Sequence, residues 1–183
     1  IGRILVGFSI LMYGMELMKD AVSPLADMPG FSSLLTAFNN PLLGVLVGAV
    51  FTGVIQSSAA SVGILQALAM TGSITYGMAI PIIMGQNIGT CVTAMLSSVG
   101  ATKNAKRAAL VHLLFNIIGT LVCLVLFLAV RALFNPAILG ESATHFGIAI
   151  CHTVFNVICT ALLLPSGNLL EKLVCRLVPD TAA

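Results

Sequence analysis

The segment TGVIQSSA at residues 52–59 and the segment GQNIGT at residues 85–90 decide the fold. Both are polar clusters inside a stretch, from Met28 through Thr102, that contains no Asp, Glu, Lys, Arg or His. An uncharged stretch of this length is typical of a chain surrounded by lipid or buried in a membrane protein. The two polar clusters therefore need partners that lipid does not provide.

The composition points to the same environment. Of 183 residues, 58% are hydrophobic and 8% are charged, whereas soluble domains carry about 25% charged residues. This excludes a soluble enzyme and a disordered tail. The net charge of +2 is too small for a nucleic-acid binder. The five cysteines form no CxxC pair and are interpreted as small hydrophobic residues. Because the chain starts at Ile1 with membrane-like residues, we expect it to be a piece of a longer protein.

Residues 41–72 are predicted to form a re-entrant helical hairpin. The uncharged run is too long for one membrane-spanning helix and too short for two, since each needs about 20 residues. Two half-length helices that meet at the central Gln56-Ser57-Ser58 fit better. Similarly, residues 75–100 are predicted to form a transmembrane helix broken near Gly85–Thr90, because paired glycines around polar residues favour unwinding.

The remaining segments complete an all-α membrane protein. Ser23-Pro24 is typical of a helix start, with Ser as the cap and Pro in the first turn. The predicted segments are transmembrane helices at 1–20, 107–134 and 142–165, an interfacial helix at 23–40 and an amphipathic tail at 168–183. With a hairpin that enters and leaves by the outer face, most basic residues share one face, which is therefore predicted to be cytoplasmic. These residues are Arg3, Lys103, Lys106, Arg107, Lys172 and Arg176.

Helix ends at the two polar clusters offer the chemistry of an ion site. A helix that ends at Gln56 leaves free carbonyls, and one that starts at Ser57-Ser58 leaves free amides. Amides can hold an anion, whereas carbonyl, hydroxyl and Asn oxygens can hold a small hard cation. Because no Lys or Arg lies in this stretch, a bound anion has to be neutralised by amides, hydroxyls and co-bound cations. This is the logic of a cation-coupled anion transporter.

The two segments resemble the signature motifs of the type II sodium/phosphate cotransporter family, a Gln-Ser-Ser-Ser tip followed by Gly-x-Asn-Ile-Gly-Thr. The chain departs from this pattern at Ala59, where a third serine is common. The resemblance covers almost the whole chain and implies one half of an inverted-repeat secondary transporter, nearer to the second copy. It implies sodium-coupled phosphate symport across the cytoplasmic membrane by a multi-pass protein, with both ions bound between two facing tips.

On this basis we predict phosphate contacts from Ser57, Ser58, Gly89 and Thr90, and sodium contacts from Gln56, Gln86 and Asn87. Sodium is the coupling ion, and no other cofactor is expected. The expected partners are phosphate, sodium, the lipid bilayer, and the other repeat or a second copy of the chain, with no nucleic acid. Ser61 and Thr93, taken singly, are expected only to bond a carbonyl of their own helix or to link helices.

A second polar pattern recurs 40 residues apart. His112, Asn116 and Thr120 are matched by His152, Asn156 and Thr160, and a spacing of four places each set on one helical face. Together with Thr52, the His and Asn positions are candidates for lining the ion pathway. The alternative is hydrogen bonding between scaffold helices.

Other function classes remain as alternatives. An intramembrane hydrolase using Ser57 or Ser58 with His112 is disfavoured, because no Asp or Glu lies between Asp27 and Glu141 to orient the base. The chain is therefore not expected to be an enzyme. A non-transporting membrane assembly or regulatory module, and a passive anion channel, stay open. Sodium-dependent, saturable uptake would separate the transporter from the channel.

Overall fold

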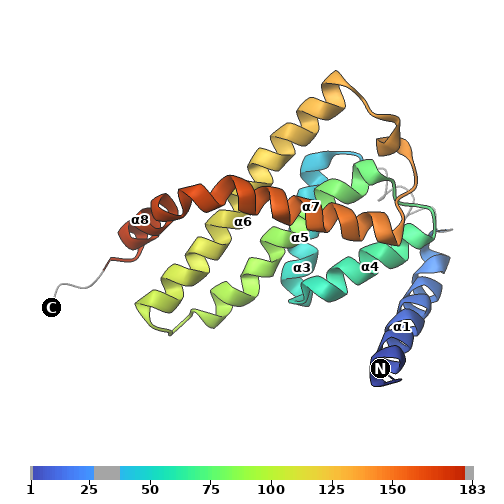
Figure 1. Cartoon of the computed structure of the whole chain (residues 1–183), viewed down its shortest axis with the longest axis horizontal. Helices are drawn as coiled ribbons and strands as arrows, with labels where there is room; N and C mark the ends of the chain where they lie inside the picture. Colours follow the sequence, from blue (N-terminus) through green and yellow to red (C-terminus); the bar gives the residue numbers. More distant parts are fainter. Residues whose placement is uncertain (1, 27–37, 180–183) are drawn as a thin grey trace.

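The computed structural model describes residues 2–26 and 38–179, and these residues form helices joined by turns, with no β-strand (Figure 1). This agrees with the all-α prediction. The elements are α1 (Gly2–Ala26), α3 (Pro41–Ile55), α4 (Ser58–Met70), α5 (Tyr76–Ser97), α6 (Lys103–Leu133), η1 (Ala137–Gly140), α7 (His145–Leu163), η2 (Leu164–Ser166) and α8 (Gly167–Leu177). Within the described residues, three helical stretches are long and apolar enough to cross a membrane, namely α5, α6 and the run from His145 to Leu177.

Residues 41–72 form two short helices joined at Gln56 and Ser57, as the sequence predicts, and we refer to this pair as the hairpin. The side chain of Asn40 accepts a hydrogen bond from the Leu42 amide, and Pro41 occupies the first turn of α3. The arms α3 and α4 contain 15 and 13 residues. At 1.5 Å per residue they are about 22 and 20 Å long, shorter than the roughly 30 Å of hydrocarbon that a spanning helix crosses.

The predicted break near Gly85–Thr90 is wrong, because α5 is continuous from Tyr76 to Ser97. The glycines serve close packing instead of unwinding. A Cβ on Gly85 would collide with the carbonyl oxygen of Val45, and one on Gly89 would collide with the carbonyl oxygen of Ala49. Glycine therefore lets the backbones of α3 and α5 approach each other at positions where any side chain would force them apart.

The polar side chains of this segment are also compatible with an unbroken helix. The Asn87 side-chain amide donates to the Ile83 carbonyl, at 2.9 Å, and the Thr90 hydroxyl donates to the Gln86 carbonyl, at 2.9 Å. Both bonds return to the residue four positions back in α5. The two side chains are thus satisfied without the unwinding that the sequence suggested.

Several boundaries also differ from the predicted ones. The first helix does not end at residue 20 but passes through Ser23 and Pro24 to Ala26, so the predicted helix start at Ser23 is wrong. The rest of the predicted interfacial helix lies mainly in residues 27–37, outside the described residues. Helix α6 begins at Lys103, before the predicted start at 107, because the Thr102 hydroxyl accepts from the Ala105 amide and caps it.

Helix α5 lies at the centre of the bundle and contacts α3, α4, α6 and α7 (Figure 1). One apolar cluster joins α5 to α4 and the start of α7, with Ile74, Ile83 and Ile148 almost fully buried. A second joins α5 to α6 and α7. The outer faces of α6 and α7 are apolar and exposed, for example at Val125 and Val157, as expected of surfaces that meet lipid.

We expect Gly85→Ala to destabilise the protein by about 1–3 kcal/mol, because the added methyl group forces α3 away from α5. The matched control is Gly7→Ala in α1, whose Cβ would meet nothing within 4 Å. That change should leave stability unchanged or raise it by up to about 1 kcal/mol through helix propensity. Thermal unfolding in detergent measures both, and equal effects would contradict the packing role of Gly85.

Candidate ion-binding site at the hairpin tip

The tip of the hairpin is formed by two residues between α3 and α4. Gln56 adopts a left-handed conformation (φ 57°, ψ 22°), and its amide donates to the Thr52 carbonyl, at 2.7 Å. Ser57 is extended and caps α4, its hydroxyl accepting from the Ala60 amide at 3.2 Å. Both tip residues are exposed. The amides of Ser58 and Ala59, in the first turn of α4, have no partner within their own helix, so the positive end of α4 faces outward here.

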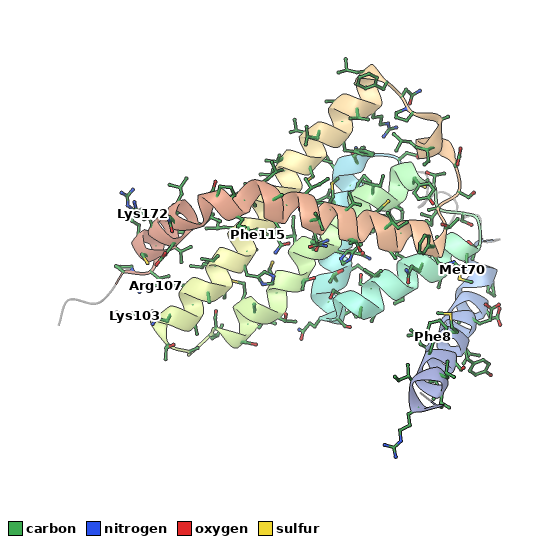
Figure 2. All side chains as sticks on the ribbon, viewed as in Figure 1. Phe8, Met70, Lys103, Arg107, Phe115 and Lys172 are labelled. Carbon is green, nitrogen blue, oxygen red and sulfur yellow. The ribbon has the colours of Figure 1, made fainter. Side chains whose placement is uncertain are left out.

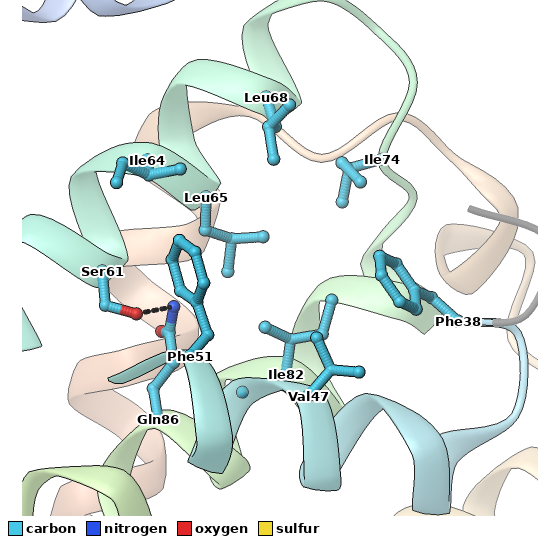
Figure 3. Close-up of a pocket in the computed structure, with 11 residues that line it drawn as sticks. Phe38, Val47, Phe51, Ser61, Ile64, Leu65, Leu68, Ile74, Ile82 and Gln86 are labelled. Carbon is cyan, nitrogen blue, oxygen red and sulfur yellow. Dashed lines mark hydrogen bonds between the residues drawn. The ribbon is translucent and has the colours of Figure 1, made fainter. Parts of the chain in front are cut away.

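One turn below the tip, polar side chains of three helices meet. The hydroxyls of Thr52 (α3) and Ser61 (α4) are 2.7 Å apart. The side-chain amide of Gln86 (α5) donates to the Ser61 oxygen at 2.9 Å (Figure 3). Thr52 and Ser61 are fully buried and Gln86 is 2% exposed. We refer to Thr52, Ser61 and Gln86 as the polar triad.

The polar triad is incompletely satisfied. The Gln86 Oε1 atom is buried and has no hydrogen-bond partner among the described residues. A buried carbonyl oxygen without a partner costs about 1–3 kcal/mol. A buried, unpartnered atom in a native fold needs a physical explanation. One explanation is that the oxygen coordinates a bound ligand. Carbonyl and hydroxyl oxygens are the ligands that hard cations take in proteins.

A cavity of about 240 Å³ adjoins the polar triad between α3, α4 and α5 (Figure 3). Ser61 and Gln86 are its polar lining among the described residues, and the rest is apolar, for example Phe51, Leu65 and Ile82. The apolar lining offers Gln86 Oε1 no hydrogen-bond donor on that side.

The structure brings some of the predicted site residues together and not others. Gln56, Ser57 and Ser58 share the tip, and Thr52 and Gln86 share the polar triad below it. Asn87 and Thr90 instead bond their own helix. Gly89 is buried where α5 meets α3, so its amide is part of a continuous helix and not of a helix start.

The histidine–asparagine repeat is placed on α6 and α7. In each copy the asparagine side chain donates to the carbonyl of the histidine four residues back: Asn116 to His112 at 2.9 Å and Asn156 to His152 at 2.8 Å. These bonds lie within one helix. The Thr120 hydroxyl makes a bond between helices instead, donating to the Met84 carbonyl of α5 at 3.2 Å.

Sequence reasoning gave Ser61 only a general role, yet Ser61 lies at the centre of the polar triad. Its position four residues after Ser57 places both serines on one face of α4. This four-residue spacing could have identified Ser61 as a candidate site residue from the sequence. Thr93 behaves as expected and bonds the Thr90 carbonyl of its own helix.

An all-helical membrane chain in which the ends of short helices lie near buried polar oxygens is typical of a secondary transporter. The chain belongs to the Na+/Pi-cotransporter family, whose model matches residues 10–153. This confirms the resemblance drawn from the two motifs. The family is one of transporters and not of enzymes, which confirms the non-enzymatic prediction.

Three curated relatives illustrate the range of the family. "Uncharacterized protein YqeW" of Bacillus subtilis (strain 168) is 31% identical over 98% of this chain and 58% of its own length. "Putative inorganic phosphate export protein YjbB" of Salmonella typhimurium is 28% identical over 98% of this chain and 33% of its own length. "Sodium-dependent phosphate transport protein 2B" of Homo sapiens is 40% identical over 51% of this chain and 14% of its own length. The chain thus spans about half or less of these proteins. No solved structure matches the chain.

We expect Ser61→Ala to lower the free energy of unfolding by about 1–3 kcal/mol, because Thr52 loses a partner and the Gln86 amide is left buried without one. Ser9→Ala makes the same chemical change on the exposed face of α1, where the hydroxyl bonds only the Leu5 carbonyl. It should change stability by less than about 0.5 kcal/mol. Denaturant or thermal unfolding compares the two, and a neutral Ser61→Ala would contradict the network.

Proposed function

We propose that this chain provides one half of the ion-binding site of a sodium-coupled phosphate symporter in the cytoplasmic membrane. The observation that carries the proposal is the buried Gln86 Oε1 atom, which has no partner among the described residues and lies one turn below an exposed tip where α4 starts. The polar triad offers oxygens to sodium, and the tip offers amides and the hydroxyls of Ser57 and Ser58 to phosphate. Gln56, at the tip itself, offers its side-chain oxygen to sodium.

In this proposal α3 and α4 form a re-entrant hairpin. Each arm is too short to span the hydrocarbon alone, and the tip residues carry no charge. The exposed tip faces the matching tip of an inverted repeat, or of a second copy of the chain, so that two sets of amides surround one phosphate. The chain alone then does not transport.

The direction of net transport follows from the imposed gradients. Inward movement driven by sodium is our proposal, by analogy with the relative named as a sodium-dependent phosphate transport protein. The relatives named as putative phosphate exporters favour a second candidate, outward movement. Proteoliposomes of the intact transporter, with sodium imposed on one side at a time, distinguish the two. A passive anion channel would carry phosphate equally without sodium.

Gln86→Leu tests the proposed cation site. Removing the unpartnered oxygen should raise the sodium concentration for half-maximal phosphate uptake at least about tenfold, equivalent to about 1.4 kcal/mol. Stability without sodium should change little, since a buried unsatisfied atom is removed along with one hydrogen bond. The matched control is Gln66→Leu on α4, whose amide donates to the His145 carbonyl at 2.9 Å. If both variants keep wild-type sodium dependence, Gln86 is not a cation ligand.

Ser57 tests the proposed phosphate site. Asp and Asn both cap helices as well as Ser does, so Ser57→Asp and Ser57→Asn should both preserve the start of α4. Only Asp adds a negative charge, which at about 5 Å from phosphate and an effective dielectric of about 20 repels it by about 3 kcal/mol. We expect Asp to weaken phosphate affinity by about two decades and Asn to change it only severalfold. Equal affinities of the two variants in uptake assays would place phosphate elsewhere.

A further inference from the structure

Helix α7 is long enough to cross the hydrocarbon by itself, which leaves α8 for the membrane surface. Helix α7 has 19 residues and is therefore about 28 Å long, close to the roughly 30 Å thickness of the hydrocarbon. The short turn η2, with Pro165, separates it from α8. At the same end of the molecule α6 begins at Lys103, and α8 contacts α6 there (Figure 1). Figure 2 shows Lys103, Arg107 and Lys172 together at this end.

Helix α8 has two apolar edges with different surroundings. Leu170 and Val174 are buried, with 7% and 0% of their surface exposed, and hold α8 to the bundle. Leu169, Leu173 and Leu177 are exposed by 70%, 41% and 58%. Because these three leucines follow one another at intervals of four, they lie along one line on the helix. We refer to them as the leucine stripe.

The orientation of the leucine stripe is fixed by Arg107. Its guanidinium donates twice to the Val178 carbonyl, from Nε at 3.0 Å and from Nη2 at 2.8 Å. A third bond, from Nη1 to the Asn104 oxygen at 3.3 Å, holds the guanidinium to the first turns of α6. Since Val178 directly follows the last leucine, these bonds set the rotation of α8 relative to α6.

The charges of α8 are distributed unevenly about the leucine stripe. At about 100° per residue, Arg176 lies next to Leu169 around the helix, and Lys172 lies just beyond. Both side chains are exposed. Glu171 lies about 120° past Leu177, beyond the buried Leu170 and Val174, and lines a cleft of about 210 Å³ with Arg107 of α6. The exposed leucines are thus bordered by cations on one side, and the carboxylate of α8 does not border them.

We propose that the leucine stripe with Lys172 and Arg176 is a docking surface for the anionic lipids of the adjacent membrane leaflet. The leucines enter the boundary between headgroups and acyl chains, and the two cations contact lipid phosphates. The charge complementarity and the continuity of α8 with the apolar surface of α7 favour lipid over a protein partner. Exposed Lys106 on α6 extends the basic surface at the same end. Each cation near an anionic leaflet should favour anionic lipid by about fivefold.

A single tryptophan can report on this surface, because the chain contains none. The chain is reconstituted with Leu173→Trp in vesicles of phosphatidylcholine and phosphatidylglycerol, of which one lipid at a time is brominated. Quenching by each brominated lipid gives the relative association of the two headgroups at α8. The control reporter is Phe146→Trp, an exposed aromatic in the first turn of α7, at the other end of that helix.

We expect brominated phosphatidylglycerol to associate with Trp at position 173 about fivefold or more over phosphatidylcholine. Lys172→Gln combined with Arg176→Gln, or 1 M salt with its Debye length of about 3 Å, should reduce this preference to near one. The Phe146→Trp reporter should show no change with the double variant. Circular dichroism confirms that the variants keep their helices.

Two results would overturn the proposal. Equal quenching by both lipids at position 173, unchanged by the double variant, would mean lipid contact without headgroup recognition. Absence of quenching by either lipid would mean that water or another protein surface, such as a second copy, covers the stripe. Because lipid contact and not phosphate uptake is measured, this outcome is independent of the proposed transport function.

Discussion

The close contact between α3 and α5 is the constraint on which the rest of the structure depends. Gly48 of α3 faces the Ile82 carbonyl of α5, and Gly85 and Gly89 face carbonyls of α3, so each backbone fills the space a side chain would take. The same glycines lie beside two members of the polar triad, since Gly48 lies against the Gln86 backbone and Gly89 against the Thr52 side chain. Ser61 of the third helix, α4, then bonds both Thr52 and Gln86. The close contact of α3 and α5 thus places two of the three side chains, and α4 supplies the one that links them.

The same contact explains why much, but not all, of the fold is predictable from the sequence. Each arm of the hairpin is signalled by residues at its own start. Asn40 and Pro41 start α3, and the Ser57 side chain caps α4 by accepting from the Ala60 amide three residues later. Local signals of this kind need no knowledge of the neighbouring helix. The glycines of α5 are different, because glycine permits both unwinding and close packing. Which of these occurs depends on the Val45 and Ala49 carbonyls of a helix some 40 residues away in sequence, so the predicted break was wrong.

In the candidate site, too, local sequence signals were predictable and contacts between distant helices were not. The sequence drew attention to Gln56, Ser57, Ser58 and Gln86, because polar residues in an uncharged membrane stretch need partners. The sequence could not predict that the Gln86 side chain donates to Ser61 of α4, whereas the side chain of the neighbouring Asn87 donates to the Ile83 carbonyl of its own helix. Side chains one residue apart on a helix point about 100° apart, and only the arrangement of α3 and α4 decides which of them meets a partner.

The distribution of charge links the proposed site to the proposed lipid surface. Arginine and lysine are absent from Met28 to Thr102, the stretch that holds the tip and the polar triad, whereas Lys103, Lys106, Arg107, Lys172 and Arg176 gather at the start of α6 and on α8. A fixed cation beside the tip would offset part of the phosphate charge and would lower the dependence on sodium. Without one, phosphate in a dehydrated site depends on a co-bound cation, and each ion then raises the affinity for the other by the same factor. In the proposed site, the lack of Lys and Arg among residues 28–102 makes this coupling the means by which phosphate is neutralised, and the basic residues on α6 and α8 lie on other elements of the chain.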